Sequence, residues 1–113
     1  MIILHCLKKS TWENHKDEKF YGEEYLSTCG FIHCSDIDTF CKVAPNFKDI
    51  NEPLVLLCID TALVQPEIKW EDLEDCGTRF PHIYGLLNID SVVEIMPFLK
   101  DVSDGFDKMD LPL

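Results

Sequence analysis

The chain has 113 residues, 46% of them hydrophobic, and a formal net charge of −11 at pH 7. Its length is typical of one domain and its apolar content suffices for one compact core, which excludes two domains and a disordered or fibrous chain. Because nucleic-acid backbones bind through clustered Lys and Arg, an acidic chain with Arg79 as its single arginine is also a poor candidate for nucleic-acid binding.

The N-terminal part predicts one strand, one short helix and two brief elements. Residues 2–7 are largely apolar and predict the opening strand. Ser10 and Glu13 match a capping box, with Ser10 as the N-cap, and predict a helix that ends near His15. A brief strand and one helical turn are expected within residues 20–27.

Two principal strands are predicted in the middle of the chain. Residues 30–35 begin at a glycine and read as a strand. Ser35 or Asp36 then caps a helix that runs toward Pro45. Residues 54–59 are apolar without interruption, which predicts a strand in the middle of the sheet, buried on both faces.

The second half predicts three further strands, at residues 68–71, 80–85 and 91–97, with a polar loop over residues 72–78. Strands separated by short helices, without regular βαβ crossovers, are typical of an α+β fold. We therefore expect a compact, split or curved β-sheet with short helices rather than a doubly wound sheet.

We expect a single domain over residues 1–100 and an acidic tail over residues 101–113, where the apolar periodicity is lost. No apolar run reaches the length of a membrane span, and the apolar start of the chain is too short for a signal peptide. The sequence therefore predicts a soluble, cytoplasmic protein whose six cysteines are reduced thiols.

Three of the four histidines lie in apolar strand contexts, namely His5, His33 and His82. A lone strand histidine is more often a hydrogen-bonded structural residue than a catalyst, but three together favour a functional cleft. His15 is different, because it lies at a charged helix end and is expected on the surface.

Two six-residue signatures carry a family resemblance: Gly-Phe-Ile-His-Cys-Ser at residues 30–35 and Phe-Pro-His-Ile-Tyr-Gly at residues 80–85. Together with His5, Trp12 and the Trp-Glu pair at residues 70–71, they make the chain, apart from its tail, resemble the bacterial domain-of-unknown-function family 952. That family looks like a remote relative of the ADP-ribosyltransferase-like fold, in which a split sheet clamps NAD and an early-strand histidine holds the adenosine ribose.

The resemblance implies an NAD- or nucleotide-binding transferase that acts at a ribose N-glycosidic bond or at a phosphate. In such a site His5 would bond a ribose hydroxyl, and Glu71 would orient the 2′-hydroxyl or stabilise positive charge on the sugar. The expected catalytic residues are His5, His33, Glu71 and His82. The expected ligand-binding residues are Trp12, Phe31, Ser35, Tyr84, which would stack on a base, and Arg79, which would bond a phosphate.

Three other functions stay open. A metal site could use the three strand histidines, or His33 with Cys29 and Cys34, although their spacing does not favour zinc. Cys34 as a nucleophile is disfavoured because it points away from His33 on a strand. The last alternative is a module that binds a small ligand or a protein without catalysis.

Overall fold

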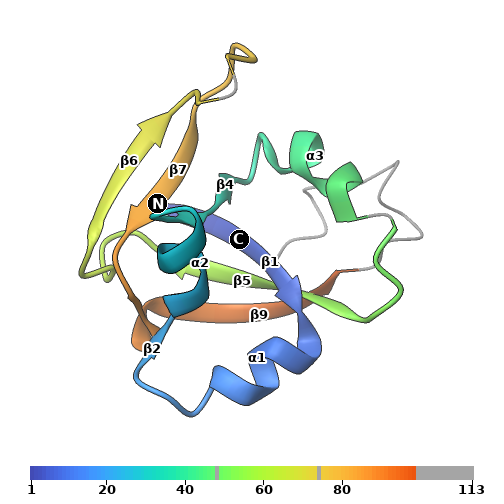
Figure 1. Cartoon of the computed structure of the whole chain (residues 1–113), viewed down its shortest axis with the longest axis vertical. Coiled ribbons are helices and arrows are strands. Elements are labelled where there is room, and N and C mark those ends of the chain that lie inside the picture. Colours follow the sequence, from blue (N-terminus) through green and yellow to red (C-terminus); the bar gives the residue numbers. More distant parts are fainter. Residues whose placement is uncertain (48, 74, 99–113) are drawn as a thin grey trace.

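The computed structural model describes residues 1–47, 49–73 and 75–98, which form three antiparallel sheets with short helices (Figure 1). The elements are β1 (Ile2–Lys8), α1 (Lys9–His15), β2 (Phe20–Tyr21), α2 (Glu23–Thr28), β3 (Ile32–His33), β4 (Ser35–Asp36), α3 (Phe40–Val43), η1 (Ala44–Phe47), β5 (Leu54–Asp60), β6 (Glu67–Glu71), β7 (Phe80–Tyr84), β8 (Leu87–Asn88), η2 (Ile89–Ser91) and β9 (Val92–Phe98).

The predicted α+β class is confirmed, and the ADP-ribosyltransferase-like architecture stays a prediction. The tail expected over residues 101–113 lies outside the described residues. No helix of the described part combines the length and the apolar content that crossing a membrane requires.

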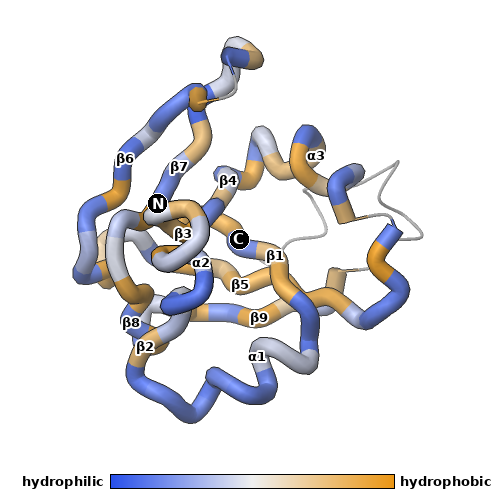
Figure 2. The backbone as a smooth tube through the Cα atoms, in the orientation of Figure 1, coloured by the Kyte–Doolittle hydropathy of each residue, from blue (hydrophilic) through white to orange (hydrophobic). Residues whose placement is uncertain are grey.

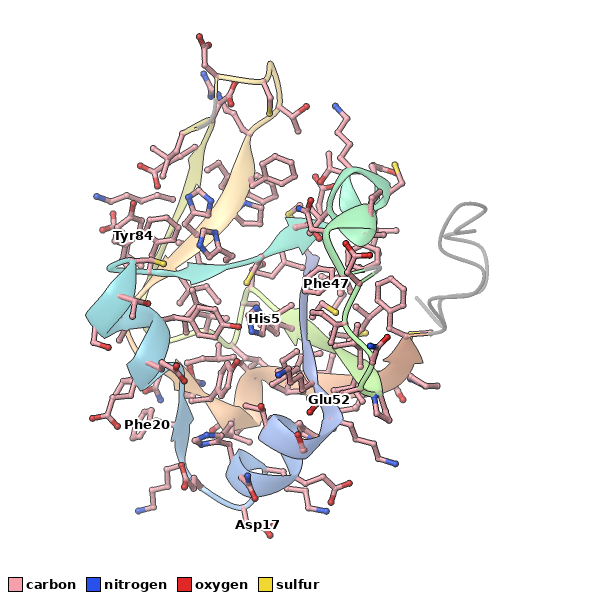
Figure 3. All side chains as sticks on the ribbon, turned by 45° about the vertical axis from the view of Figure 1, so that its right-hand side comes forward. His5, Asp17, Phe20, Phe47, Glu52 and Tyr84 are labelled. Atoms are coloured by element: carbon pink, nitrogen blue, oxygen red, sulfur yellow. The ribbon has the colours of Figure 1, made fainter. Side chains whose placement is uncertain are left out.

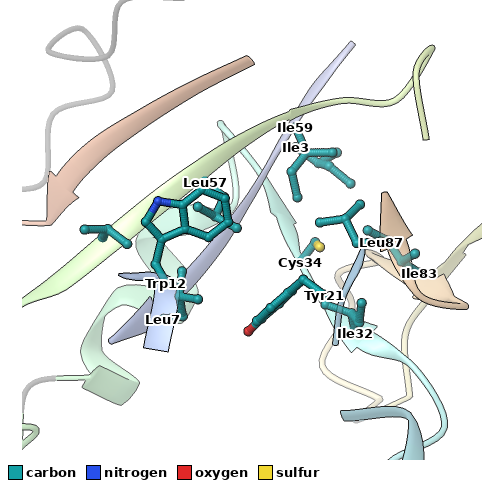
Figure 4. Packing of buried hydrophobic residues seen from close by; sticks show 11 residues of the cluster. Ile3, Leu7, Trp12, Tyr21, Ile32, Cys34, Leu57, Ile59, Ile83 and Leu87 are labelled. Carbon is teal, nitrogen blue, oxygen red and sulfur yellow. The ribbon is translucent and has the colours of Figure 1, made fainter. Parts of the chain in front are cut away.

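The four-stranded sheet, in the order β4-β1-β5-β9, forms the centre of the fold. β5 pairs with β1 on one side and with β9 on the other, so the predicted central strand is confirmed. Residues 54–59 are all buried because both faces of the strand are covered. One face joins the cluster that contains Leu57 and Trp12 (Figure 4), and the other joins the cluster that contains Leu56 and Phe40.

The helix α1 covers one face of this sheet with Trp12, which is 6% exposed and belongs to the same buried cluster as Leu57 (Figure 4). The capping box predicted at Ser10 is wrong. The helix starts at Lys9, directly after β1, and the N-cap residue Lys8 makes no side-chain capping bond. Ser10 therefore lies inside the first turn. The segment from α1 to β2 is hydrophilic and runs along the outside of the molecule (Figure 2).

The three-stranded sheet β3-β7-β6 holds the histidines of the two sequence signatures, His33 and His82. His33 pairs with His82 across β3 and β7, and Lys69 of β6 pairs with His82 on its other side. Because side chains alternate between the two faces of a strand, paired residues share a face. Ile32 and Ile83, both fully buried, point into the core, so the histidines occupy the opposite face.

The strand predicted at residues 30–35 is divided between two sheets. Its first part, β3, pairs with β7, and its second part, β4, pairs with β1. Between them, the main-chain N–H of Cys34 donates to the carbonyl oxygen of Pro81 at 3.1 Å. This crossing brings the histidine of β3 next to the first strand of the chain.

Candidate functional site

A cleft of about 740 Å³ is lined by residues of β1, the sheet β3-β7-β6 and the helical segments α3 and η1. Its volume lies in the usual range of small-molecule sites. Six residues that the sequence predicts as site residues line it: His5, Phe31, His33, Ser35, Glu71 and His82. Figure 3 shows His5 near the middle of the molecule, with Phe47 of η1 and Tyr84 of β7 on different sides of it.

His82 and Glu71 form a hydrogen-bonded pair on the sheet. The Nδ1 atom of His82 lies 3.1 Å from Oε1 of Glu71, and the two side chains are 7% and 27% exposed. Since a carboxylate oxygen can only accept, Nδ1 of His82 carries the hydrogen and donates it. In the neutral ring, Nε2 of His82 therefore holds the lone pair.

The hydroxyl of Tyr84 donates to the same Oε1 atom of Glu71 at 2.6 Å. This bond, followed by the one from His82, lowers the pKa of the Glu71 carboxyl below its ordinary value. The same bond raises the pKa of Tyr84 above its ordinary value, because losing the phenol proton would leave two negative oxygens in contact. Glu71 is therefore a carboxylate at neutral pH, and Tyr84 is a neutral phenol.

Phe31 packs among these residues and holds their rings together. Its ring centroid lies 4.3 Å from that of His82, 4.8 Å from that of His33 and 5.3 Å from that of Tyr84. The rings of His33 and His82 lie 5.7 Å apart and nearly perpendicular to each other. Two imidazoles and one phenol thus pack around a single phenylalanine ring.

His5 lies beneath this group and is only 3% exposed. Its Nδ1 atom is 2.6 Å from the main-chain oxygen of His33, and its Nε2 atom is 2.9 Å from the hydroxyl of Tyr21. The carbonyl can only accept, so Nδ1 donates to it and Nε2 accepts from the Tyr21 hydroxyl. Burial lowers the pKa of His5 from 6.5 to about 4, which keeps the ring neutral. Both ring nitrogens are therefore occupied by protein groups.

Three predicted ligand-binding residues are placed differently from the six in the cleft. Trp12 lies in the core under α1, so packing accounts for it. Arg79 is exposed before β7 and does not line the cleft. Tyr84 does not line the cleft, but it bonds Glu71 and packs against Phe31, which both do.

The helical wall of the cleft was not predicted. Phe40, Val43 and Phe47 recur at helical spacing, which is typical of a core stripe, and all three line the cleft while they also pack in or against a buried cluster. Lys42 donates to the hydroxyl of Thr78 and so joins α3 to the loop before β7. The spacing of the apolar residues was the available signal, but it does not distinguish a core face from a pocket wall.

The residues for a metal site do not come together in the described part of the chain. Among residues 1–47, 49–73 and 75–98, no three His, Cys, Asp or Glu side chains are close enough to hold an ion. All six cysteines are unpaired thiols. Burial raises the pKa of Cys34 far above its ordinary value, which removes it as an activated nucleophile.

Comparisons with known proteins give a family and a fold. The crystal structure of CC0527 from Caulobacter crescentus is similar to this chain with a TM-score of 0.71 and 26% identity, over 91% of this chain and 98% of that one. The solution NMR structure of CC0527 has a TM-score of 0.68 at 26% identity, over 93% of this chain and 96% of that one. No curated protein matches the chain.

The family described as "Protein of unknown function (DUF952)" matches residues 6–95. Both sequence signatures and the cleft residues of the three-stranded sheet lie inside this match, whereas His5 lies just before it. Since the match extends over most of the chain, the chain belongs to the DUF952 family.

Proposed function

We propose that the cleft binds a small nucleotide-like ligand and that the His82–Glu71 pair moves a proton at the ribose N-glycosidic bond or the phosphate of that ligand. Proton transfer at either of these positions is the chemistry expected of an ADP-ribosyltransferase-like enzyme. The observation that carries the proposal is the 3.1 Å contact between His82 Nδ1 and Glu71 Oε1 in a cleft that also contains His33.

The pair has the arrangement of a general base. The hydrogen bond to Glu71 fixes the tautomer and the orientation of the His82 ring, which leaves Nε2 to accept a proton. Glu71 also stabilises the positive charge that the ring gains on accepting that proton. His33 lies beside it on the paired strand and supplies a second imidazole for proton transfer.

The rest of the cleft supports a ligand with an aromatic ring. Phe31, Phe40, Phe47 and Phe80 line it, and aromatic walls with a few polar groups are typical of small-molecule sites. In this arrangement His5 positions the main chain of His33 and makes no hydrogen bond to the ligand, since both of its ring nitrogens are engaged.

The test is calorimetric titration with NAD, ADP-ribose, AMP and adenosine, combined with a search for reaction products by chromatography. The variants are His82→Asn and Glu71→Gln. A matched control exists in the exposed pair of His15 and Glu18, whose atoms Nδ1 and Oε2 lie 3.0 Å apart outside the cleft.

The wild-type protein and the control variants His15→Asn and Glu18→Gln are expected to bind at least one of these compounds saturably and to convert it. The His82→Asn variant should lose conversion by at least about a hundredfold, the usual size of a general-base contribution, while it still binds. Absence of saturable binding to all four compounds would contradict the proposal. If the wild-type protein binds a compound but does not convert it, the catalytic part of the proposal is wrong and a module that binds a small ligand without catalysis remains.

A further inference from the structure

We propose that the ligand of this cleft is a nucleoside, an N-riboside without phosphate groups, and that NAD does not fit it. The inference rests on the proposed function and narrows its substrate class. It follows from the charges and the surfaces that the described residues bring to the cleft.

The cleft is poor in positive charge. Among the described residues that line it, Lys42 is the only lysine or arginine, and its amine is already bonded to the hydroxyl of Thr78. Arg79, which the sequence suggested as the phosphate contact, is exposed and does not line the cleft. The diphosphate of NAD prefers bidentate or clustered cations, and the described residues that line the cleft do not provide them.

The cleft also contains a negative charge. Glu71 lines it, and its pKa is lowered mainly by the hydrogen bond from Tyr84, so it is ionised at neutral pH. A phosphate group bound nearby would be repelled by this carboxylate. A ribose hydroxyl, in contrast, can donate to a carboxylate, and a sugar that develops positive charge is stabilised by it.

The distribution of polar and aromatic groups in the cleft also favours a nucleoside. The groups on the sheet that can bond a ribose are His33, Glu71 and His82, whereas the helical side presents the rings of Phe40 and Phe47 beside Lys42 and Asn46. A nucleoside, with one sugar and one base, matches these two surfaces. A second nucleotide would have to place many of its polar groups against the aromatic rings, where they would lose their hydrogen bonds to water.

For a nucleoside the reactive bond is the N-glycosidic bond, and water completes the reaction. The bond between C1′ and the ring nitrogen breaks with its electron pair on the nitrogen, and the water oxygen bonds C1′. His82 takes a proton from this water and, with a neutral nucleoside such as adenosine, returns it to the leaving ring; nicotinamide leaves its cationic riboside as a neutral ring, and the proton then passes to bulk water. The products are the free base and ribose, so no further reactant is required.

The test is titration of the wild-type protein with adenosine, nicotinamide riboside, AMP and NAD, with the released base measured by chromatography. A nucleoside is expected to bind at least about tenfold more tightly than AMP and NAD and to release its base. Equal or tighter binding of AMP or NAD would overturn the inference and leave the proposed function intact. If none of the four binds saturably, both fall, and nucleoside binding without release of base would overturn the hydrolytic step.

Two variants test whether the charge of Glu71, rather than the shape of the cleft, disfavours ligands with phosphate groups. Glu71→Gln removes the negative charge from the cleft and should reduce the preference for nucleosides over AMP by several fold. Glu67→Gln makes the same change four residues earlier on β6, at an exposed position that does not line the cleft, and should leave that preference unchanged. An unchanged preference in Glu71→Gln would contradict the electrostatic part of the inference.

Discussion

The imidazole Nδ1 of His5 donates a hydrogen bond to the main-chain oxygen of His33, with 2.6 Å between the two atoms. The bond joins β1 of the four-stranded sheet to β3 of the three-stranded sheet, at the place where the chain passes from one sheet to the other. Tyr21 completes the arrangement by donating its hydroxyl hydrogen to the other ring nitrogen of His5. The two sheets are therefore connected by a buried polar chain directly beneath the cleft.

Replacing His5 by Leu should destabilise the protein by about 3 kcal/mol, because a buried group that loses its hydrogen-bond partner costs about 1–3 kcal/mol and two partners are affected. These partners are the main-chain oxygen of His33 and the hydroxyl of Tyr21. Urea denaturation measures the free energy of unfolding. The exposed His15 provides the control, and His15→Leu should change stability by less than about 0.5 kcal/mol. Equal stability of the two variants would show that the buried bonds contribute nothing.

The stability of the protein should fall between pH 6.5 and pH 4 because of His5. Its pKa is about 4 in the folded protein, against 6.5 ordinarily, so the unfolded chain binds this proton more tightly than the folded one. The contribution of the neutral ring is thus complete above pH 6.5 and is lost as the pH falls toward 4. The difference between the two pKa values corresponds to about 3 kcal/mol.

Urea denaturation at pH 7.5 and pH 4.5 tests this dependence. The wild-type protein and His15→Leu should both lose about 2–3 kcal/mol more between the two conditions than His5→Leu, which lacks the buried group. The comparison between variants cancels the carboxylates, which also lose stabilising interactions in acid. Parallel losses in all three proteins would mean that His5 is not the titrating group.

Much of the fold follows from local patterns. The uninterrupted apolar run at residues 54–59 becomes the buried centre of the sheet, and the signature at residues 80–85 becomes β7. The alternation within the second signature also places His82 and Tyr84 on one face, since residues two apart share a face of a strand. These features depend on neighbouring residues alone, so the sequence is sufficient to predict them.

The arrangement of the cleft depends on contacts between distant parts of the chain. Trp12 lies between two polar residues in the sequence and is buried under α1, whereas His33 lies between two apolar residues and is exposed in the cleft. The role of Lys42 follows from its bond to Thr78, thirty-six residues away. No local pattern encodes such pairs, because the packing of one element on another determines them.

Removing the charge of Glu71 should lower the pKa of Tyr84 toward its ordinary value. The hydrogen bond to Glu71 is the largest cause that raises the pKa of this phenol, and Glu67, which pairs with Tyr84 across the two strands, contributes least. Carbon NMR of the tyrosine ring during a pH titration would follow the phenol. Glu71→Gln should shift the midpoint down clearly, and Glu67→Gln much less. A larger effect from Glu67 would mean that the 2.6 Å contact does not form in solution.

Alkylation should distinguish two groups of cysteines. Cys6, Cys34 and Cys58 are buried, whereas Cys29, Cys41 and Cys76 are exposed. Burial raises the pKa of Cys6 to about 12 and that of Cys58 to about 11, and the thiolate is the form that reacts. Mass spectrometry after brief iodoacetamide treatment should therefore find the exposed group modified in the native protein and both groups in urea. Rapid native modification of the buried group would contradict the packing of the sheet.

Gly22 should tolerate alanine less well than Gly30, although both have a positive φ, of 110° and 87°. At Gly30 an added Cβ would meet no atom within 4 Å, so only the backbone strain of about 1–2 kcal/mol is expected. At Gly22 the Cβ would lie 2.3 Å from Cδ1 of Ile32, a fully buried side chain, and a clash in the core typically adds about 1–3 kcal/mol. Since Ile32 lies between Phe31 and His33, Gly22→Ala should also disturb the cleft, which the ring signals of His33 in proton NMR would reveal. Equal losses of stability in both variants, with unchanged His33 signals, would show that Ile32 moves aside without cost and that Gly22 does not determine the position of β3.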